Sequence, residues 1–330
     1  MKSLVTGGAG FIGSHLVDAL LGLDHDVIVL DNFSTGRAGN IEHVKNDIEF
    51  VECDISQSDG WSKSFRGVDW VFHLAALADI VPSIQDPTGY FCSNVDGTFN
   101  ILQSARESEV GRFVYVASSS SYGLPNIFPT PETAEIDPQY PYALTKYLGE
   151  ELVMHWAKVY ELPALSLRFF NVYGPRSRTS GTYGAVFGVF LAQKLANAQF
   201  TVVGDGSQTR DVTDVSDVVQ ALITAAQSSE TDAVYNVGSG ATVSVNRLVE
   251  LLGGEKVFIP KRPGEPDCTF ADISKIQAEL GWYPEVTIEQ GVSRLLEHIE
   301  YWRKAPVWTP DSIATATQDW FRYLGSSDSG

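Results

Sequence analysis

Tyr142 and Lys146 stand four residues apart, a spacing that places both side chains on one face of a helix, where they can share a ligand. A phenol has a pKa near 10, so serving as a base near neutral pH requires lowering that pKa by about 3 units, or roughly 4 kcal/mol. A neighbouring ammonium group and a cationic ligand both act in that direction. We therefore expect Lys146 to lower the pKa of Tyr142, and Tyr142 to transfer a proton.

Serine residues cluster at Ser118 to Ser121, where an apolar, strand-like run ends. In a parallel sheet covered by helices on both faces, ligands bind at the carboxyl ends of the strands. We expect these hydroxyl groups to face the same ligand as Tyr142.

A second motif is suited to a phosphate. Gly7, Gly10 and Gly13 follow the apolar run Leu4 to Thr6 and precede a helical pattern. Glycines allow a tight turn and let a pyrophosphate approach the backbone at a helix N-terminus, where N–H groups favour anions. Asp31 ends the next apolar run 18 residues after Gly13, as expected for a carboxylate that binds the adenosine ribose of a dinucleotide.

The carboxylate of Asp31 favours NAD over NADP, because it would repel a 2′-phosphate. Arg37 lies close enough in the sequence to leave NADP open. The glycine motif lacks the Lys-Ser/Thr ending of a P-loop, which argues against a kinase or nucleotide triphosphatase. With NAD as cofactor, Lys146 would also bind the nicotinamide ribose.

A parallel sheet has to position these motifs, and its strands are visible as short apolar runs separated by helical stretches. The runs are Leu4 to Thr6, Val27 to Leu30, Ile48 to Val51, Trp70 to Leu74, Phe113 to Val116 and Leu165 to Phe170. This pattern predicts an α/β fold with a doubly wound, Rossmann-type parallel sheet. We predict an NAD-binding domain over residues 1–175, completed by a strand around 234–237. Residues 176–330 would then form mainly a smaller substrate-binding lobe with a C-terminal extension.

Composition excludes several classes of protein. The 330 residues carry a formal charge of -18, which disfavours nucleic acid and anionic membranes as partners. The three cysteines lack a CxxC spacing and the six histidines lack metal-binding spacings, so we expect neither disulfides nor a metal. The chain shows no signal-peptide pattern and no apolar run of about 18 residues, which predicts a cytoplasmic protein.

An ordered set of motifs resembles the extended short-chain dehydrogenase/reductase family, in particular its nucleotide-sugar epimerases and dehydratases. The chain looks most similar to the UDP-glucose and UDP-N-acetylglucosamine 4-epimerases. The matching motifs are TGGAGFIGSHL (6–16), DNFSTG (31–36), HLAA (73–76), NVDGT (94–98), SSSSYG (118–123), YALTK (142–146), RFFNVYGPR (168–176), TRDVTDVSD (209–217) and RPGEPDCTFADISK (262–275).

The resemblance implies a set of NAD contacts. Asp31 and Asn32 would bind the adenosine ribose, and Asp54 and Ile55 the adenine. Ala75 and Asn94 would bind the middle of the cofactor, although Asn94 could instead cap its helix. The full implied set is Gly7, Gly10, Phe11, Ile12, Gly13, Asp31, Asn32, Asp54, Ile55, Leu74, Ala75, Ala76, Asn94, Tyr142, Lys146 and Phe169.

The resemblance also implies catalytic and substrate contacts. Ser118, Tyr142 and Lys146 would be catalytic, with Ser118 bonded to the sugar O4. The implied substrate-binding residues are Ser118, Ser119, Ser120, Asn171, Arg210, Arg262, Glu265 and Thr269. Among them, the asparagine and the two arginines would bind the nucleotide diphosphate, and the glutamate the nucleoside ribose.

The residues after Ser118 indicate whether the resembled enzyme is a dehydratase or an epimerase. The 4,6-dehydratases that this chain resembles carry an Asp-Glu pair there, whereas this chain has Ser119 and Ser120. A serine hydroxyl does not readily abstract a C5 proton, so elimination is disfavoured and C4 epimerisation through a 4-keto sugar is favoured. Two alternatives remain: a dehydratase or C4 dehydrogenase acting on a GDP- or dTDP-sugar, and a non-catalytic NAD-binding regulator.

Thr269 bears on the choice of sugar. In the resembled epimerases, the residue three before the Asp of the ADISK motif is bulky in enzymes restricted to UDP-glucose and UDP-galactose, and small in those that accept a 2-acetamido group. Thr269 occupies this position, which predicts a pocket for UDP-GlcNAc and UDP-GalNAc.

Two further features concern surfaces. Val95, Phe99 and Leu102, like Leu144, Leu148 and Leu152, recur at helical spacing, so their outer faces could form a four-helix bundle in a homodimer or simply belong to the core. The end of the chain, Val307 to Leu324, is longer than is typical of the resembled family. Its apolar residues predict one amphipathic helix that docks on the substrate lobe through Ile313, Trp320 and Leu324.

Overall fold

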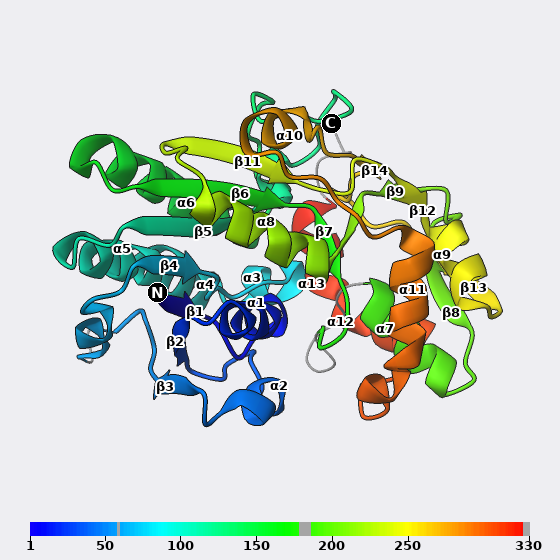
Figure 1. Cartoon of the computed structure of the whole chain (residues 1–330). Helices are drawn as coiled ribbons and strands as arrows, with labels where there is room; N and C mark the ends of the chain where they lie inside the picture. Colours follow the sequence, from blue (N-terminus) through cyan, green and yellow to red (C-terminus); the bar gives the residue numbers. More distant parts are fainter. Residues whose placement is uncertain (58–59, 178–185, 326–330) are drawn as a thin grey trace.

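The computed structural model describes residues 1–57, 60–177 and 186–325 (Figure 1). A seven-stranded sheet with the order β11-β6-β5-β4-β1-β2-β3 forms its larger part, and all its neighbouring strands are parallel. The strands are β1 (Lys2–Thr6), β2 (Asp26–Asp31), β3 (Ile48–Glu52), β4 (Trp70–His73), β5 (Arg112–Ser118), β6 (Ala164–Phe169) and β11 (Ala233–Val237). The expected doubly wound α/β fold is confirmed.

Helices cover both faces of this sheet. On one face, α1 (Phe11–Gly22) packs against α8 (Val215–Gln227), and their aliphatic residues share a core with β1, β2 and β6. On the other face, α5 (Gly97–Glu107) packs against α6 (Pro141–Tyr160). The sheet is therefore buried on both sides, which is why its strands read as nearly continuous apolar runs.

A second core lies beside the sheet, at the right of Figure 1. It contains aromatic residues of α7 (Val186–Leu195) and aliphatic residues of α9 (Val245–Leu252) and α11 (Ile288–Glu297). The strands around it are short: β7 (Asn171–Tyr173), β8 (Phe200–Val203), β9 (Thr209–Arg210), β10 (Val212–Asp214), β12 (Val243–Ser244), β13 (Lys256–Ile259) and β14 (Cys268–Thr269). They pair as β10-β7, β12-β9-β14 and β13-β8.

Shorter helices complete the described chain. They are α2 (Ala38–Ile41), α3 (Ile80–Gln85), α4 (Pro87–Phe91), α10 (Ser274–Leu280), the π-helical turn Cys92–Asp96, and 3-10 turns at Glu42–Val44, Trp61–Phe65, Ser119–Tyr122 and Ile299–Trp302. No helix in the described part of the chain is long and apolar enough to cross a membrane.

The C-terminal extension forms two helices, α12 (Pro310–Ala316) and α13 (Gln318–Leu324), rather than the single helix predicted. Thr317 separates them: its hydroxyl donates to the carbonyl of Ile313, and its backbone has left helical geometry with φ -102° and ψ 8°. Ile313 and Trp320 are both buried, as an amphipathic pattern requires. The prediction of one continuous helix was wrong because the apolar residues fit two short helices that meet at a turn.

Candidate active site

The turn from β1 to α1 leaves space beside its backbone that only glycine provides. A Cβ at Gly13 would lie 2.1 Å from the carbonyl oxygen of Gly7, and one at Gly7 would lie 2.8 Å from the backbone nitrogen of Ala75. Gly7 also has φ +71°, in the left-handed region. Helix α1 then begins with no side-chain cap among the described residues, which leaves its first N–H groups available to an anion in the cavity that Gly10 and Gly13 line. These features fit the pyrophosphate of a dinucleotide.

Asp31 lies at the end of β2, on the wall of the same cavity. Its carboxylate accepts hydrogen bonds from the backbone N–H of Ala9 at 2.9 Å and of Phe33 at 2.8 Å, which fixes its orientation. Burial raises the pKa of Asp31, and these backbone hydrogen bonds oppose that rise. Arg37 lines the cavity as well, with its guanidinium 5.7 Å from the ring centre of Tyr301.

Most of the expected NAD contacts line this one cavity. The predicted residues among its lining are Gly7, Gly10, Phe11, Ile12, Gly13, Asp31, Asn32, Asp54, Ile55, Leu74, Ala75 and Ala76. The carboxyl ends of β1, β2, β3 and β4 bring them together, as expected for a ligand crevice in a parallel sheet. The residues present therefore fit NAD.

Asn94, Tyr142, Lys146 and Phe169 are not among the described residues that line this cavity. Asn94 is buried in the π-helical turn, where its amide exchanges two hydrogen bonds with the backbone of Leu77 and donates to the hydroxyl of Thr145. This geometry braces the loop after β4 against α6, and it is not a helix cap. Phe169 is buried at the end of β6.

Ser118 and Tyr142 meet where β5 ends and α6 begins. Ser118 hydrogen-bonds to the phenol of Tyr142, and its hydroxyl oxygen also accepts from the backbone N–H of Ser120 at 3.2 Å. Pro141 starts α6, and the ring of Tyr140 stacks parallel to that of Tyr142 with centroids 6.4 Å apart. The helix start and the stacked ring together orient the phenol.

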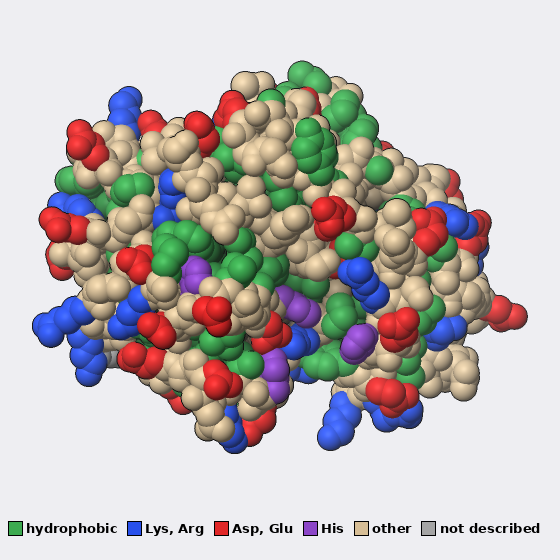
Figure 2. Space-filling view, viewed as in Figure 1, with side chains coloured by type: hydrophobic (Ala, Val, Ile, Leu, Met, Phe, Trp, Pro, Cys, Tyr) green, Lys and Arg blue, Asp and Glu red, His purple; other side chains and the backbone are tan. Residues whose placement is uncertain are grey.

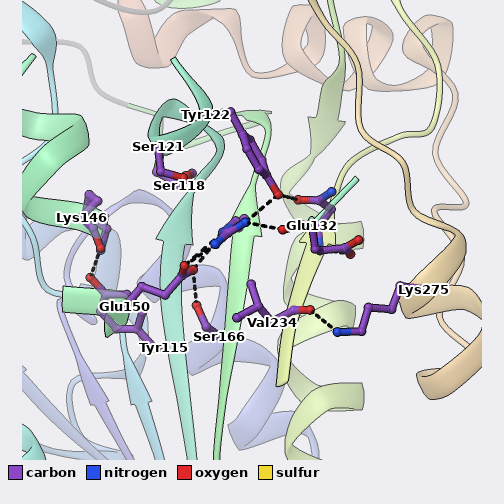
Figure 3. Close-up of polar contacts among 12 residues, drawn as sticks. Tyr115, Ser118, Ser121, Tyr122, Glu132, Lys146, Glu150, Ser166, Val234 and Lys275 are labelled. Carbon is purple, nitrogen blue, oxygen red and sulfur yellow. Dashed lines mark hydrogen bonds and ion pairs between the residues drawn. The ribbon is translucent and has the colours of Figure 1, made fainter. Parts of the chain in front are cut away.

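Lys146 lies one turn further along α6 and is buried, with its ammonium 4.3 Å from the ring centre of Tyr115. Burial lowers the pKa of Lys146 to about 7, although the carboxylate of Glu150 acts in the opposite direction. The Tyr115 hydroxyl donates to the Lys146 carbonyl at 3.2 Å, a contact that Figure 3 shows.

The pKa of Tyr142 differs from the expectation. Burial raises it, because removing the phenolate from water costs more than the Ser118 hydrogen bond returns. The protein by itself thus moves this pKa in the direction opposite to the one that the sequence predicted. The positive charge of a bound nicotinamide ring acts in the required direction.

A buried polar network holds the Lys146 helix in place (Figure 3). Glu150 accepts hydrogen bonds from the guanidinium of Arg168 and from the hydroxyl of Ser166. Arg168 also donates to the hydroxyl of Tyr122 at 2.9 Å, which donates to Asn236 at 2.7 Å. The network joins α6, β6 and β11 behind the catalytic residues.

Two adjoining cavities lie beside the cofactor cavity and share Ile80, Asn171, Arg210, Glu265 and Trp320. We call the first the nucleotide cavity; Phe187 and Phe190 of α7 line it. We call the second the hexose cavity. The expected residues among its lining are Ser119, Ser120, Tyr142, Asn171, Arg210, Glu265 and Thr269.

Glu265 forms ion pairs with Arg210 and Arg262 at the junction of these cavities. Its carboxylate accepts from Arg210 at 3.1 Å and from Arg262 at 2.8 Å and 3.2 Å. Two guanidinium groups around one carboxylate leave a net positive charge, which suits a diphosphate. Asn171 donates at 2.9 Å both to the carbonyl of Asp211 and to the hydroxyl of Thr269.

Several residues in or behind the site were not predicted from the sequence. Asp79 lines both the cofactor and the nucleotide cavities and has φ +104°, a strained backbone typical of functional sites. Glu150 stands four residues after Lys146, so its position on the same helix face was visible in the spacing. Trp320 was predicted to dock on the lobe but not to line the site. No group of three or more potential metal ligands occurs within residues 1–57, 60–177 and 186–325.

Comparisons with known proteins agree with this fold and site. A family model described as the NAD dependent epimerase/dehydratase family matches residues 3–238. The UDP-glucose 4-epimerase of Mycolicibacterium smegmatis is 36% identical over 90% of this chain and 98% of that protein. The solved structure of a UDP-glucose 4-epimerase from Thermotoga maritima is 34% identical, with a TM-score of 0.85 over 92% of this chain and 99% of that chain. The solved structure of a UDP-N-acetylglucosamine 4-epimerase from Methanobrevibacter ruminantium is 30% identical, with a TM-score of 0.86 over 91% of this chain and 98% of that chain.

The fold and the cofactor cavity define an NAD-dependent enzyme built on a doubly wound sheet. The chain belongs to the NAD-dependent epimerase/dehydratase family. The resemblance seen in the sequence is confirmed, and so is NAD as the cofactor.

Proposed function

We propose that this protein epimerises a nucleotide sugar at C4 through a 4-keto intermediate, with UDP-GlcNAc/UDP-GalNAc, UDP-glucose/UDP-galactose or both pairs as substrates. The observation that carries the proposal is the composition of the hexose cavity. Tyr142 lines it, Ser118 hydrogen-bonds to that phenol, and the arginine pair lies at its junction with the nucleotide cavity. The relatives named UDP-sugar 4-epimerases support the same reaction.

The residues divide the reaction among them. Tyr142 takes the proton of the C4 hydroxyl, and Ser118 holds that oxygen and the phenol in line. NAD, when bound, supplies an acceptor and donor of hydride. Lys146 holds the nicotinamide ribose, and its positive charge favours the phenolate. Arg210 and Arg262 hold the diphosphate while the 4-keto sugar turns and presents its other face. Tyr142 then returns the proton, so that C4 is inverted and no NAD is consumed.

The lining of the hexose cavity favours this outcome over elimination. Removing water across C5 and C6 requires an acid and a base near those carbons. Glu265 is the only carboxylate among the described residues of this lining, and two arginines already bind it. Ser119 and Ser120 stand in the positions that would face the sugar.

Thr269 supports an N-acetylated substrate. It lies on the wall of the hexose cavity, and its small side chain accepts hydrogen bonds from Asn171 and from the backbone of Asp211. A side chain of this size leaves space beside the sugar ring. We propose that this space accommodates a 2-acetamido group.

We further propose a cytoplasmic homodimer in which residues 1–175 and β11 bind NAD and residues 176–330 mainly bind substrate. Phe91, Phe99 and Leu144 lie exposed on α4, α5 and α6, a cluster suited to pairing with a second copy. Light scattering would give the mass of a dimer for the natural chain and a smaller mass for Phe99→Glu. A monomeric natural chain would contradict the assignment.

The test of the reaction is NMR of the purified protein incubated with UDP-GlcNAc, UDP-glucose and their C4 epimers, without added reductant. We expect each accepted substrate to reach an equilibrium mixture with its C4 epimer. Net production of NADH or of a 4-keto sugar would instead support a dehydrogenase or dehydratase. Binding of NAD without turnover of any sugar nucleotide would support a regulator.

A further inference from the structure

The short C-terminal helix α13 lies across the substrate site. Trp320 on this helix is buried, and it lines both the nucleotide cavity and the hexose cavity. It therefore lies at the junction of the two cavities.

Helix α13 is attached on both sides of this junction. On the side of the large sheet it packs against α3, and the amide of Gln85 donates to the carboxylate of Asp319 at 2.8 Å. On the other side, the indole N–H of Trp320 donates to the carbonyl of Pro263 at 2.7 Å, and Leu324 lies close to Gly264. The helix thus bridges the two walls of the cavities.

The indole ring also contacts a residue implicated in phosphate binding. The guanidinium of Arg262 lies over the Trp320 ring, 4.9 Å from its centre, in a cation–π contact. With one face covered by the ring, the N–H groups along the edge of Arg262 are directed at Glu265 at 2.8 Å and 3.2 Å. Stacking of this kind fixes the plane of the guanidinium, which reduces the entropy lost when it binds an anion.

Two of the similar proteins are matched over almost their whole length, while part of this chain stays unmatched. The solved Thermotoga maritima epimerase is matched over 99% of its length but only 92% of this chain, and the Mycolicibacterium smegmatis enzyme over 98% and 90%.

We propose that Trp320 is a substrate-positioning residue, which closes the junction of the two cavities and holds Arg262 in the plane that binds the nucleotide diphosphate. The inference rests on the proposed use of a nucleotide sugar and adds to it a residue from outside the sequence motifs. It predicts that Trp320 acts on substrate binding and not on proton or hydride transfer.

The experiment compares Trp320→Ala and Trp320→Phe with Phe321→Ala, a control on the same helix whose side chain is exposed. Calorimetry with UDP as the probe gives Kd, NMR gives kcat and KM with the sugar nucleotide, and absorbance gives the NAD content. For Trp320→Ala we expect Kd for UDP and KM to rise about tenfold, the loss of one desolvated cation–π contact, with kcat and NAD content unchanged. Trp320→Phe should recover part of the loss, and Phe321→Ala should match the natural chain.

The outcomes separate this inference from the proposed function. If Trp320→Ala binds UDP as tightly as the natural chain, or loses kcat and NAD in parallel with affinity, the positioning role is wrong and the epimerase proposal stands. If the natural chain binds UDP and the affinity depends on Trp320 but no sugar nucleotide is turned over, the reaction proposal fails and the positioning role stands. A natural chain that binds no UDP overturns both.

Discussion

Backbone and glycines shape the β1–α1 turn of the cofactor cavity, whereas side chains from distant segments shape the junction of the substrate cavities. The first depends on Gly7 and Gly13, which admit no Cβ. The second depends on Arg210 and Glu265, which are 55 residues apart, and on Trp320 and Pro263, which are 57 apart. A binding surface formed by the backbone can keep the same ligand, here NAD, when side chains are substituted. A binding surface formed by side chains changes its ligand preference with single substitutions.

This difference accounts for the family pattern in the comparisons. The relatives are named for UDP-glucose and UDP-N-acetylglucosamine, yet they share one NAD-dependent fold with this chain. Substitutions in the two regions should therefore have different effects: loss of NAD in the first, and altered affinity or selectivity in the second. Substitution of the proposed base Tyr142 should reduce turnover alone.

The largest effect is expected at Tyr142, which lines the hexose cavity. Tyr142→Phe removes the proton acceptor and keeps the ring, so kcat should fall by roughly a thousandfold or more. NAD content and the Kd for UDP should stay unchanged, since neither cavity loses a binding group. NMR turnover assays with calorimetry measure both; near-normal turnover would exclude Tyr142 as the base.

The next effect concerns His73, at the end of β4 in the cofactor region. Burial lowers the pKa of His73 to about 3, against an ordinary value near 6.5. Between pH 6.5 and pH 3, His73 is therefore protonated in the unfolded chain but neutral in the folded chain. The free energy of unfolding consequently falls as the pH falls from 6.5 toward 3. The loss attributable to His73 should reach roughly 4 kcal/mol.

Urea unfolding of the natural chain and of His73→Gln at pH 7 and pH 4.5 tests this expectation. The variant loses hydrogen bonds to Thr6 and Thr98, so it should be less stable at pH 7. Its stability should nevertheless depend less on pH than that of the natural chain. Equal pH dependence in the two proteins would refute the assignment to His73.

A third test separates the two regions directly. Gly13→Ala would place a Cβ 2.1 Å from the carbonyl oxygen of Gly7, whereas Gly22→Ala in the same helix meets nothing within 4 Å. We expect Gly13→Ala to lose roughly 1–3 kcal/mol of NAD affinity or fold stability. Gly22→Ala should be neutral or slightly stabilising. Thermal unfolding measures fold stability, and NAD titration measures NAD affinity. Equal results for the two variants would mean that the close approach of Gly13 to Gly7 does not shape the NAD site.

The smallest effect is expected from the substrate side alone. Thr269→Tyr fills space in the hexose cavity, so kcat/KM for UDP-GlcNAc should fall about tenfold more than kcat/KM for UDP-glucose. Thr269→Ser keeps a small hydroxyl side chain and should leave selectivity unchanged. NAD content should not change in either variant. Equal losses on both substrates would rule out Thr269 as the selective residue.

The sequence was most informative where local patterns decide the structure. Six apolar runs and the strand expected around 234–237 predicted the seven parallel strands, because strands buried on both faces are continuously apolar. The glycine spacing and Asp31 predicted the cofactor cavity, because adjacent strand ends place such motifs together. The four-residue spacing of Tyr142 and Lys146 predicted that both side chains lie on one face of a helix.

The remainder depends on packing between distant segments. Arg168 on β6 binds Glu150 on α6, 18 residues earlier in the sequence. Helix or strand periodicity cannot predict a pair of this kind. Trp320 reaches the cavities only because Thr317 turns the chain between α12 and α13. The pKa of Tyr142 was predicted for the site with the cofactor bound; in the chain alone burial, which spacing does not reveal, raises it.

The return of hydrogen to the opposite face of C4 is the central claim, and isotope labelling tests it most directly. UDP-glucose and UDP-GlcNAc carrying deuterium at C4 would be incubated with the purified, NAD-loaded protein, and the products followed by NMR and by absorbance of NADH. The account predicts that at least one substrate yields its C4 epimer with the deuterium still on C4 and no accumulation of NADH. Loss of the label from C4, or NADH accumulating with a 4-keto sugar, would contradict it.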